Sequence, residues 1–146
     1  MCALCFIFHS GAAAASYSRS ECFIEGREDM RNDKLSVQSM DFAVNIIALV
    51  KELKNQRETV ISNQVGRSGT SIGANIREAQ YAHGKPDFIS KLQIALKEAN
   101  ETGYWLELAY KTGYLDMEHY RKLDAQCTSL RAMLISSINT AKGNTT

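Results

Sequence analysis

The chain has 146 residues, of which 45% are hydrophobic, and its formal net charge is only +1. This length is enough for one domain with a substantial core. A single proline, few glycines outside one central stretch and the lack of alternating strand-like segments favour an all-α fold and argue against a sheet protein.

Residues 1–29 differ in character from the rest of the chain. An apolar start is followed by the alanine run Ala12–Ala15 and by a serine-rich stretch. A signal peptide would fit the alanines, but no basic residue precedes the apolar run, His9 interrupts it, and it is too short to span a membrane. Residues Ile24–Arg27 match a protease site common in expression vectors. We therefore expect residues 1–29 to be a leader or a vector-derived extension that is mobile.

Four cysteines are present, three of them in this leader (Cys2, Cys5 and Cys22) and one, Cys127, at a core-type helical position. This distribution does not make a disulfide framework, and it fits a reduced, cytoplasmic setting. Zinc binding by the leader cysteines together with His9 is an alternative, but the second closely spaced ligand pair of a typical zinc motif is missing.

Apolar residues recur at intervals of three and four after the leader, which predicts a first helix from Val37 to Asn55. A second helix is predicted from Glu58 to Ala82, with the stretch Gln64–Glu78 at its centre. Its expected buried face comprises Ile61, Val65, Ile72, Ile76 and Ala79, with Ser68 and Asn75 on or beside it.

The central stretch contains three glycines, Gly66, Gly69 and Gly73. Each glycine lowers helix stability by roughly 1 kcal/mol relative to alanine, a loss that close approach of another helix can offset. We therefore interpret this helix as the one against which the others pack. A phosphate-binding loop is the alternative interpretation, but no strand precedes the stretch and no Gly-Lys-Ser/Thr ending follows it.

A third helix is predicted from Pro86 to Lys111, because proline and Asp87 are favoured in a first helical turn. Gly113 marks its end, and Asp116 is expected to cap a fourth helix reaching Ala141. The expected buried positions are Phe88, Leu92, Ala95, Leu96, Ala99, Gly103, Leu106 and Tyr110 in the third helix, and Tyr120, Leu123, Cys127, Leu130, Leu134, Ile138 and Ala141 in the fourth. Four helices with short loops predict an up-down-up-down four-helix bundle over residues 30–142, with a tail at 143–146.

No group of residues has a spacing that indicates catalysis. A di-iron bundle needs two Glu-x-x-His motifs, and this chain offers only the related pair Asp116 and His119. With His9 and His83 as the other histidines, little is available for metal or acid–base chemistry. We therefore predict a protein that is not an enzyme, with no catalytic residues, metal site or cofactor; a hydrolase or metalloenzyme is the third-ranked alternative.

Two motifs in the second and third helices have the pattern of a known family. The first is Arg-Ser-x-x-Ser-Ile-x-x-Asn-Ile-x-Glu at residues 67–78, and the second runs from Asp87 to Thr102 and is followed by Tyr-Trp-Leu at 104–106. Together they resemble the four-helix-bundle family of 23S rRNA intervening-sequence proteins, over about Leu35 to Ala141. The chain departs from the family pattern at Ala79, where glycine is usual, and at Ala82, where a basic residue is common.

The resemblance implies a left-handed four-helix bundle that assembles into a homopentameric ring and has no enzymatic activity. Members of the family are encoded within insertions in ribosomal RNA genes, and related proteins are accessory factors of a retroelement reverse transcriptase. The partners implied are therefore further copies of the chain, RNA or DNA, and a reverse transcriptase or other protein. No membrane partner is implied.

The residues of the first motif have two interpretations. In the structural one, Ser68, Ser71 and Asn75 are small and polar because helices meet there, and Arg67 and Glu78 form ion pairs across helices or subunits. In the functional one, four cations contact nucleic-acid phosphates. These candidate contacts are Arg67, Arg77, Lys85 and Lys91.

The charge of the helical part is mildly basic. Without residues 1–29 the chain has 15 basic and 12 acidic side chains, a net charge of +3, which is far below the dense basic footprint of a dedicated nucleic-acid binder. A ring of five copies would raise the total to about fifteen and repeat each contact. The second hypothesis is a protein–protein scaffold that docks a partner through Tyr104 and Trp105.

Overall fold

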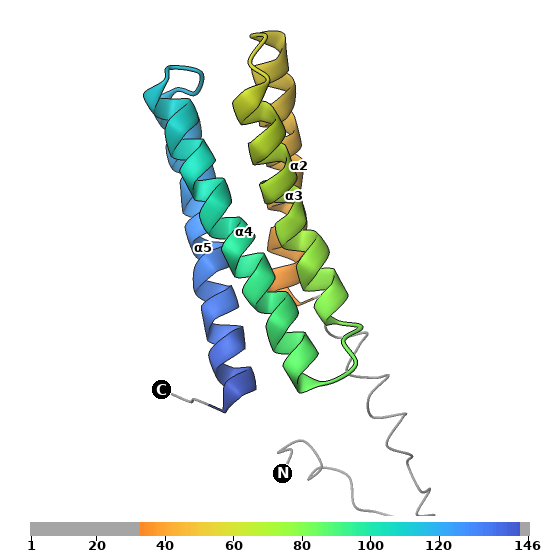
Figure 1. The fold of residues 1–146 in the computed structure, drawn as a ribbon. Helices are drawn as coiled ribbons and strands as arrows, with labels where there is room; N and C mark the ends of the chain where they lie inside the picture. The colour runs from red at the N-terminus through yellow and green to blue at the C-terminus, as the bar shows by residue number, and fades with distance from the viewer. Residues whose placement is uncertain (1–32, 144–146) are drawn as a thin grey trace, which may run out of the picture.

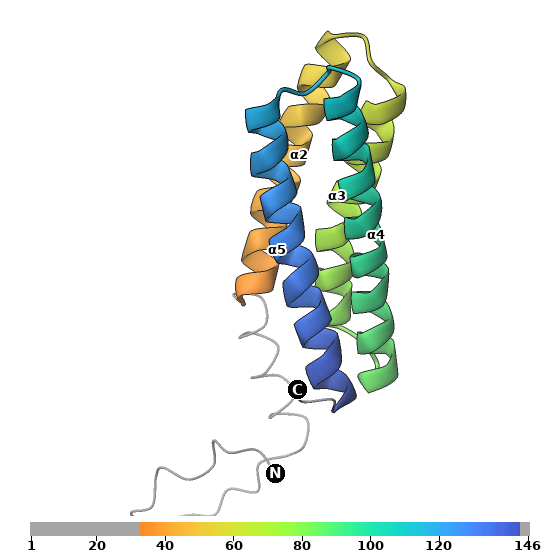
Figure 2. The same ribbon diagram turned by 90° about the vertical axis from the view of Figure 1, so that its left-hand side faces the viewer.

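The computed structural model describes residues 33–143, which form four α-helices. These are α2 (Lys34–Asn55), α3 (Val60–Ala79), α4 (Lys85–Lys111) and α5 (Met117–Lys142). Successive helices run in opposite directions and pack side by side, and α5 closes the bundle against α2 (Figures 1 and 2). The predicted all-α four-helix bundle is confirmed. The predicted leader at 1–29, the zinc alternative within it and residues 144–146 of the tail lie outside the described residues.

Two aspartates set the starts of α2 and α5. Asp33 Oδ1 accepts a hydrogen bond from the backbone N–H of Ser36 at 2.6 Å, so α2 begins about one turn earlier than the predicted Val37. Asp116 Oδ1 accepts from the N–H of His119 at 2.8 Å, which confirms the predicted cap of α5. In both helices a side chain satisfies an N–H group that has no partner within the helix.

The start of α3 is made by a glutamate outside the helix. Glu58 was expected to be its first residue, but α3 begins at Val60 and the buried Glu58 carboxylate turns back onto it. One oxygen accepts from the N–H groups of Val60 and Ile61, both at 2.9 Å, and the other from Ser62 at 2.8 Å. A negative group at this end also interacts favourably with the helix dipole.

The end of α3 also differs from the prediction, because the helix finishes at Ala79 and not at Ala82. The backbone N–H groups of residues 80–82 donate to carbonyl groups only three positions earlier. Such bonds tighten the last turn away from α-helical geometry. The regular helix therefore ends three residues earlier than its apolar pattern indicated.

The core runs along the whole bundle, and its largest fully buried apolar side chains come from all four helices. They are Phe42, Ile46, Leu53, Val65, Ile72, Leu92, Leu106, Cys127, Leu130 and Leu134. The predicted buried face of α4 is wrong by one position in its second half: Thr102 and Ala109 are buried, whereas Gly103 and Tyr110 are only half-buried. A threonine can occupy the core there because its hydroxyl finds partners, as described below.

The glycines of α3 allow close contact with α2. A Cβ atom on Gly69 would lie 2.9 Å from the Ile46 side chain, and one on Gly66 would lie 3.1 Å from Val50 Cγ2. Real Cβ atoms do not approach other atoms to 2.9 Å, so α2 could not pack at this distance against a larger residue at position 69. The prediction that small residues bring a neighbouring helix close to α3 is confirmed.

We expect Gly69→Ala to destabilise the protein, because its methyl group would overlap the fully buried Ile46. Overpacking of this kind costs about 1–3 kcal/mol, and the higher helix propensity of alanine returns at most about 1 kcal/mol. Gly73→Ala is the matched control, since its Cβ would meet Ser39 Oγ at a tolerable 3.4 Å. Urea unfolding at a single protein concentration should rank Gly69→Ala well below Gly73→Ala; equal stabilities would contradict the packing argument.

Candidate functional site

The family motif on α3 faces α4, and its first serine is fully buried. Ser68 Oγ donates to the carbonyl oxygen of Gln64 at 2.9 Å and accepts a hydrogen bond from Thr102 Oγ1 of α4, also at 2.9 Å. Thr102 Oγ1 also lies 2.8 Å from the carbonyl oxygen of Glu98. The two hydroxyl groups therefore satisfy each other where the helices meet, as buried polar groups must.

The two other polar positions of the motif interact within α3. Asn75 Nδ2 donates to the backbone carbonyl of Ser71 at 2.8 Å and to its Oγ at 3.1 Å. Both residues are half-buried. The amide is therefore bound one turn back along its own helix, so these residues support the α3 surface and leave little donor capacity for a ligand.

The charged residues of the motif form ion pairs between α3 and α4. Arg67 binds Glu101 through one guanidinium nitrogen and lies 3.4 Å from Glu98 through another. Near the other end of this helix pair, Lys91 Nζ lies 2.5 Å from Glu78 Oε2. Arg67 and Glu78 thus form ion pairs across helices within a single chain.

These contacts shift the pKa values of the groups involved. The hydrogen bond from Arg67 lowers the pKa of Glu101 below its ordinary value of 4.5; burial opposes the shift, and the Trp105 N–H and the charge of Lys97 assist it. The hydrogen bond with Glu78 raises the pKa of Lys91. Because the Arg67 side chain is 55% exposed, water screens the pair and its contribution to stability is small.

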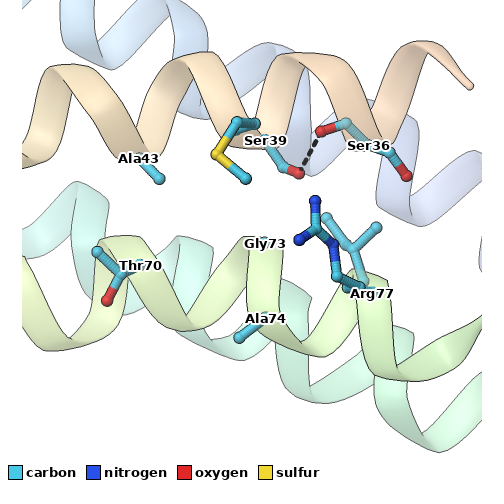
Figure 3. Close-up of a pocket in the computed structure, with 9 residues that line it drawn as sticks. Ser36, Ser39, Ala43, Thr70, Gly73, Ala74 and Arg77 are labelled. Carbon is cyan, nitrogen blue, oxygen red and sulfur yellow. Dashed lines mark hydrogen bonds between the residues drawn. The ribbon is translucent and has the colours of Figure 1, made fainter. Parts of the chain in front are cut away.

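The four candidate phosphate contacts therefore fall into two groups. Arg67 and Lys91 are held by carboxylates, whereas Arg77 and Lys85 are exposed and form no ion pair with any residue in 33–143. Lys85 is the first residue of α4, at one end of the bundle. The Arg77 guanidinium instead points across α3 toward Ser39 of α2 (Figure 3).

Arg77 lies over a shallow groove between α2 and α3 with a volume of about 290 Å³. The groove is lined mainly by small and apolar side chains, among them Met40, Ala43, Gly73 and Ala74. The hydroxyl of Ser39 in the groove is already bound, donating to the Ser36 carbonyl at 2.8 Å. One cation beside an apolar surface is suited to binding another macromolecule and does not make a reaction centre.

Metal-binding clusters and membrane spans are both absent from the described helices. Within residues 33–143, no group of three or more His, Cys, Asp or Glu side chains is arranged to hold a metal ion. None of these four helices is both long and apolar enough to cross a membrane.

The aromatic pair considered for scaffolding, Tyr104 and Trp105, is unevenly exposed. Tyr104 is 58% exposed, whereas Trp105 is half-buried against the core and its indole N–H donates to Glu101 at 3.3 Å. The two rings meet edge to face, with centroids 5.0 Å apart. Tyr104 is therefore the part of this pair that a partner protein could contact.

Thr102, Glu98 and Glu101 were missing from the predicted site, although they bind Ser68 and Arg67. They recur three and four residues apart on α4, so their shared face was visible in the sequence. Which α3 residues they meet depends on how far α4 is shifted along α3, for which the sequence holds no local signal.

Comparisons with known proteins identify relatives of this chain. The family model for the 23S rRNA-intervening sequence protein matches residues 31–136. A crystal structure of a protein with unknown function from the S23 ribosomal protein family of Bacteroides thetaiotaomicron is 53% identical, covering 71% of this chain and 97% of that chain, with a TM-score of 0.71. A comparison with curated proteins found no match.

We expect Arg67→Ala to raise the pKa of Glu101 toward 4.5, because the hydrogen bond from Arg67 is the main cause of its low value. Carboxyl ¹³C NMR titration would measure the change, and Lys97→Ala, which removes a weaker influence, should produce a smaller shift. A carboxyl group whose pKa is lower in the folded than in the unfolded protein stabilises the folded state at pH values above the unfolded pKa. This stabilisation disappears as the pH falls through the folded pKa. The stability difference between wild type and Arg67→Ala should therefore shrink as pH drops below about 4.5. An unchanged Glu101 pKa would show that the pair does not form in solution.

Proposed function

The chain belongs to the 23S rRNA-intervening sequence protein family, and from this premise we propose that it is an oligomeric, non-enzymatic bundle that binds RNA or DNA. The proposed contact surface is the end of the bundle at which α2 and α4 begin and α3 and α5 finish (Figures 1 and 2). Because the family match supplies no biochemical activity, the proposal depends on the charges at this end.

Three exposed lysines carry the proposal. Lys34 is the first residue of α2, Lys85 the first of α4 and Lys142 the last of α5. The alternating helix directions bring all three to one end of the bundle. Lysines that face a phosphate backbone release its counterions, which is the main source of sequence-independent nucleic-acid affinity.

One of the three carboxylates at this end is offset by an ion pair, and the other two accept backbone hydrogen bonds. Asp33 accepts from the Ser36 N–H, Asp87 accepts from the His83 N–H at 3.0 Å, and Glu78 binds Lys91. At the opposite end, Glu52 and Glu118 are exposed among the basic residues. A phosphate approaching the first end would therefore meet Lys34, Lys85 and Lys142 with two carboxylates that keep their charge, Asp33 and Asp87.

Oligomerisation would make this modest charge useful. One copy contributes a net charge of +3 without its first 29 residues, and a ring of five copies would carry about fifteen. Contacts that are weak in one copy then act together at a high effective concentration. Proteins encoded with ribosomal RNA insertions, as this resemblance implies, would meet RNA as they are produced.

A protein–protein scaffold, or an accessory factor without nucleic-acid contact, is the second candidate function. The 58% exposed Tyr104 supports it, since an exposed aromatic ring is a frequent anchor at protein interfaces. On this alternative, Tyr104→Ala should abolish capture of a protein partner, and added salt should have little effect on the complex.

We expect the triple variant Lys34→Ala/Lys85→Ala/Lys142→Ala to bind RNA more weakly than wild type, because it removes the proposed phosphate contacts. Fluorescence anisotropy over a range of salt concentrations would measure both affinity and salt dependence. The slope of log affinity against log salt should become shallower by about one for each lysine–phosphate interaction that the variant removes.

The matched control is Lys51→Ala/Lys54→Ala/Arg121→Ala, which removes the same charge from the opposite end. Equal reductions in affinity for the two triple variants would attribute binding to net charge alone and contradict an end-specific surface. Wild-type binding that does not change with salt would contradict the electrostatic proposal altogether.

A further inference from the structure

The connection between α3 and α4, residues 80–84, presents an exposed aromatic side chain at the end of the bundle that carries the three lysines (Figure 1). This side chain is Tyr81, which is 57% exposed. Tyr104 packs edge to face on Trp105, whereas the ring of Tyr81 contacts no other aromatic ring within residues 33–143. A ring with this exposure can receive another planar group against its face.

Hydrogen bonds hold this connection in place on both sides of the ring. The backbone N–H of Tyr81 donates to a carbonyl group of the last turn of α3 at 3.0 Å. The neighbouring Gln80 is buried, and its Nε2 donates to Ser36 Oγ of α2 at 2.9 Å. Beyond the ring, the N–H of His83 donates to Asp87 Oδ2 at 3.0 Å. A side chain displayed on a fixed turn has less conformational freedom to lose when a ligand binds.

The same bonds place Tyr81 next to two of the lysines. Lys85 follows it by four positions and is the first residue of α4. The hydrogen bond to Ser36 brings the connection to the start of α2, where Lys34 is the first helical residue. The exposed ring therefore has an exposed cation on each of two neighbouring helices.

A ring beside lysines indicates which form of nucleic acid this end binds. Lysines contact the phosphates of single and double strands alike. An aromatic ring needs a base with an open face, and opening the stack of a duplex to provide one costs free energy. Proteins that bind single strands combine a basic surface with aromatic side chains on which bases stack. Because Asp33 and Asp87 keep their charge at this end, stacking would add affinity that charge alone supplies weakly.

We infer that this end of the bundle binds single-stranded nucleic acid, with Tyr81 stacking on one base while Lys34 and Lys85 contact neighbouring phosphates. The inference rests on the proposed function, since it requires the lysines to bind a nucleic acid, and it adds the form that is bound. A duplex would bind through the lysines alone and therefore more weakly.

The test compares the affinities of the full 146-residue chain for three probes by fluorescence anisotropy. They are a single-stranded RNA of mixed sequence, the same RNA paired with its complement, and an abasic strand of equal length. Tyr81→Ala should lower the affinity for the single strand by roughly five- to a hundredfold, the range expected for one stacked base. Its affinities for the duplex and the abasic strand should equal those of wild type. Circular dichroism would verify that the variant keeps the fold.

Two further variants at position 81 separate the aromatic ring from its hydroxyl group and its apolar area. Tyr81→Phe keeps the ring and should bind the single strand as wild type does, whereas Tyr81→Leu should lose as much affinity as Tyr81→Ala. The matched control is Tyr114→Ala, which removes a 37% exposed ring from the connection between α4 and α5 at the opposite end. It should leave the affinity for the single strand unchanged.

The outcomes distinguish a failure of this inference from a failure of the proposed function. A single-strand affinity that Tyr81→Ala leaves unchanged, or lowers equally for all three probes, would overturn the inference and leave the lysine surface standing. Wild-type binding that depends neither on salt nor on the three lysines would overturn the proposed function, and this inference with it.

Discussion

The contact between Gly69 and Ile46 is the constraint on which the bundle depends. At this contact α3 contributes no side chain, and a Cβ at position 69 would lie 2.9 Å from the Ile46 side chain. Three glycines make α3 a weak helix on its own, by roughly 1 kcal/mol each, so it depends on packing against both neighbours. With α3 held against α2, Ser68 faces α4, and Thr102 supplies the partner that a buried hydroxyl requires. The polar character of the family motif follows from this double contact.

The position of a basic residue along the bundle decides what it can bind. Arg67 and Lys91 lie where α3 and α4 run side by side, and carboxylates of the facing helix bind them. The negative charges of Glu98 and Glu101 beside Arg67 would oppose an approaching phosphate. Lysines at a helix end have no facing helix. Unlike Arg67 and Lys91, the helix-end residues Lys34, Lys85 and Lys142 form no ion pair with any residue in 33–143.

The elements that could be predicted from sequence are those with a local cause. Helical periodicity identified all four helices and most of the core. Asp116 was correctly predicted as the cap of α5, because the capping hydrogen bond spans only three residues. Features that depend on the spacing between helices could not be predicted. The buried position of Thr102, whose hydroxyl bonds to Ser68 of α3, was not predicted. An ion pair for Arg67 was predicted without the identity of its carboxylates. In each case the missing information was the relative height of two helices.

The manner of assembly decides whether the charge of one copy can add to that of the next. In a head-to-tail ring every copy has the same orientation, so Lys34, Lys85 and Lys142 of each copy would lie on the same rim. An antiparallel pair of copies would instead place its two lysine ends on opposite sides. An assembly of parallel copies would therefore add the charge of each copy to that of the next at a common rim.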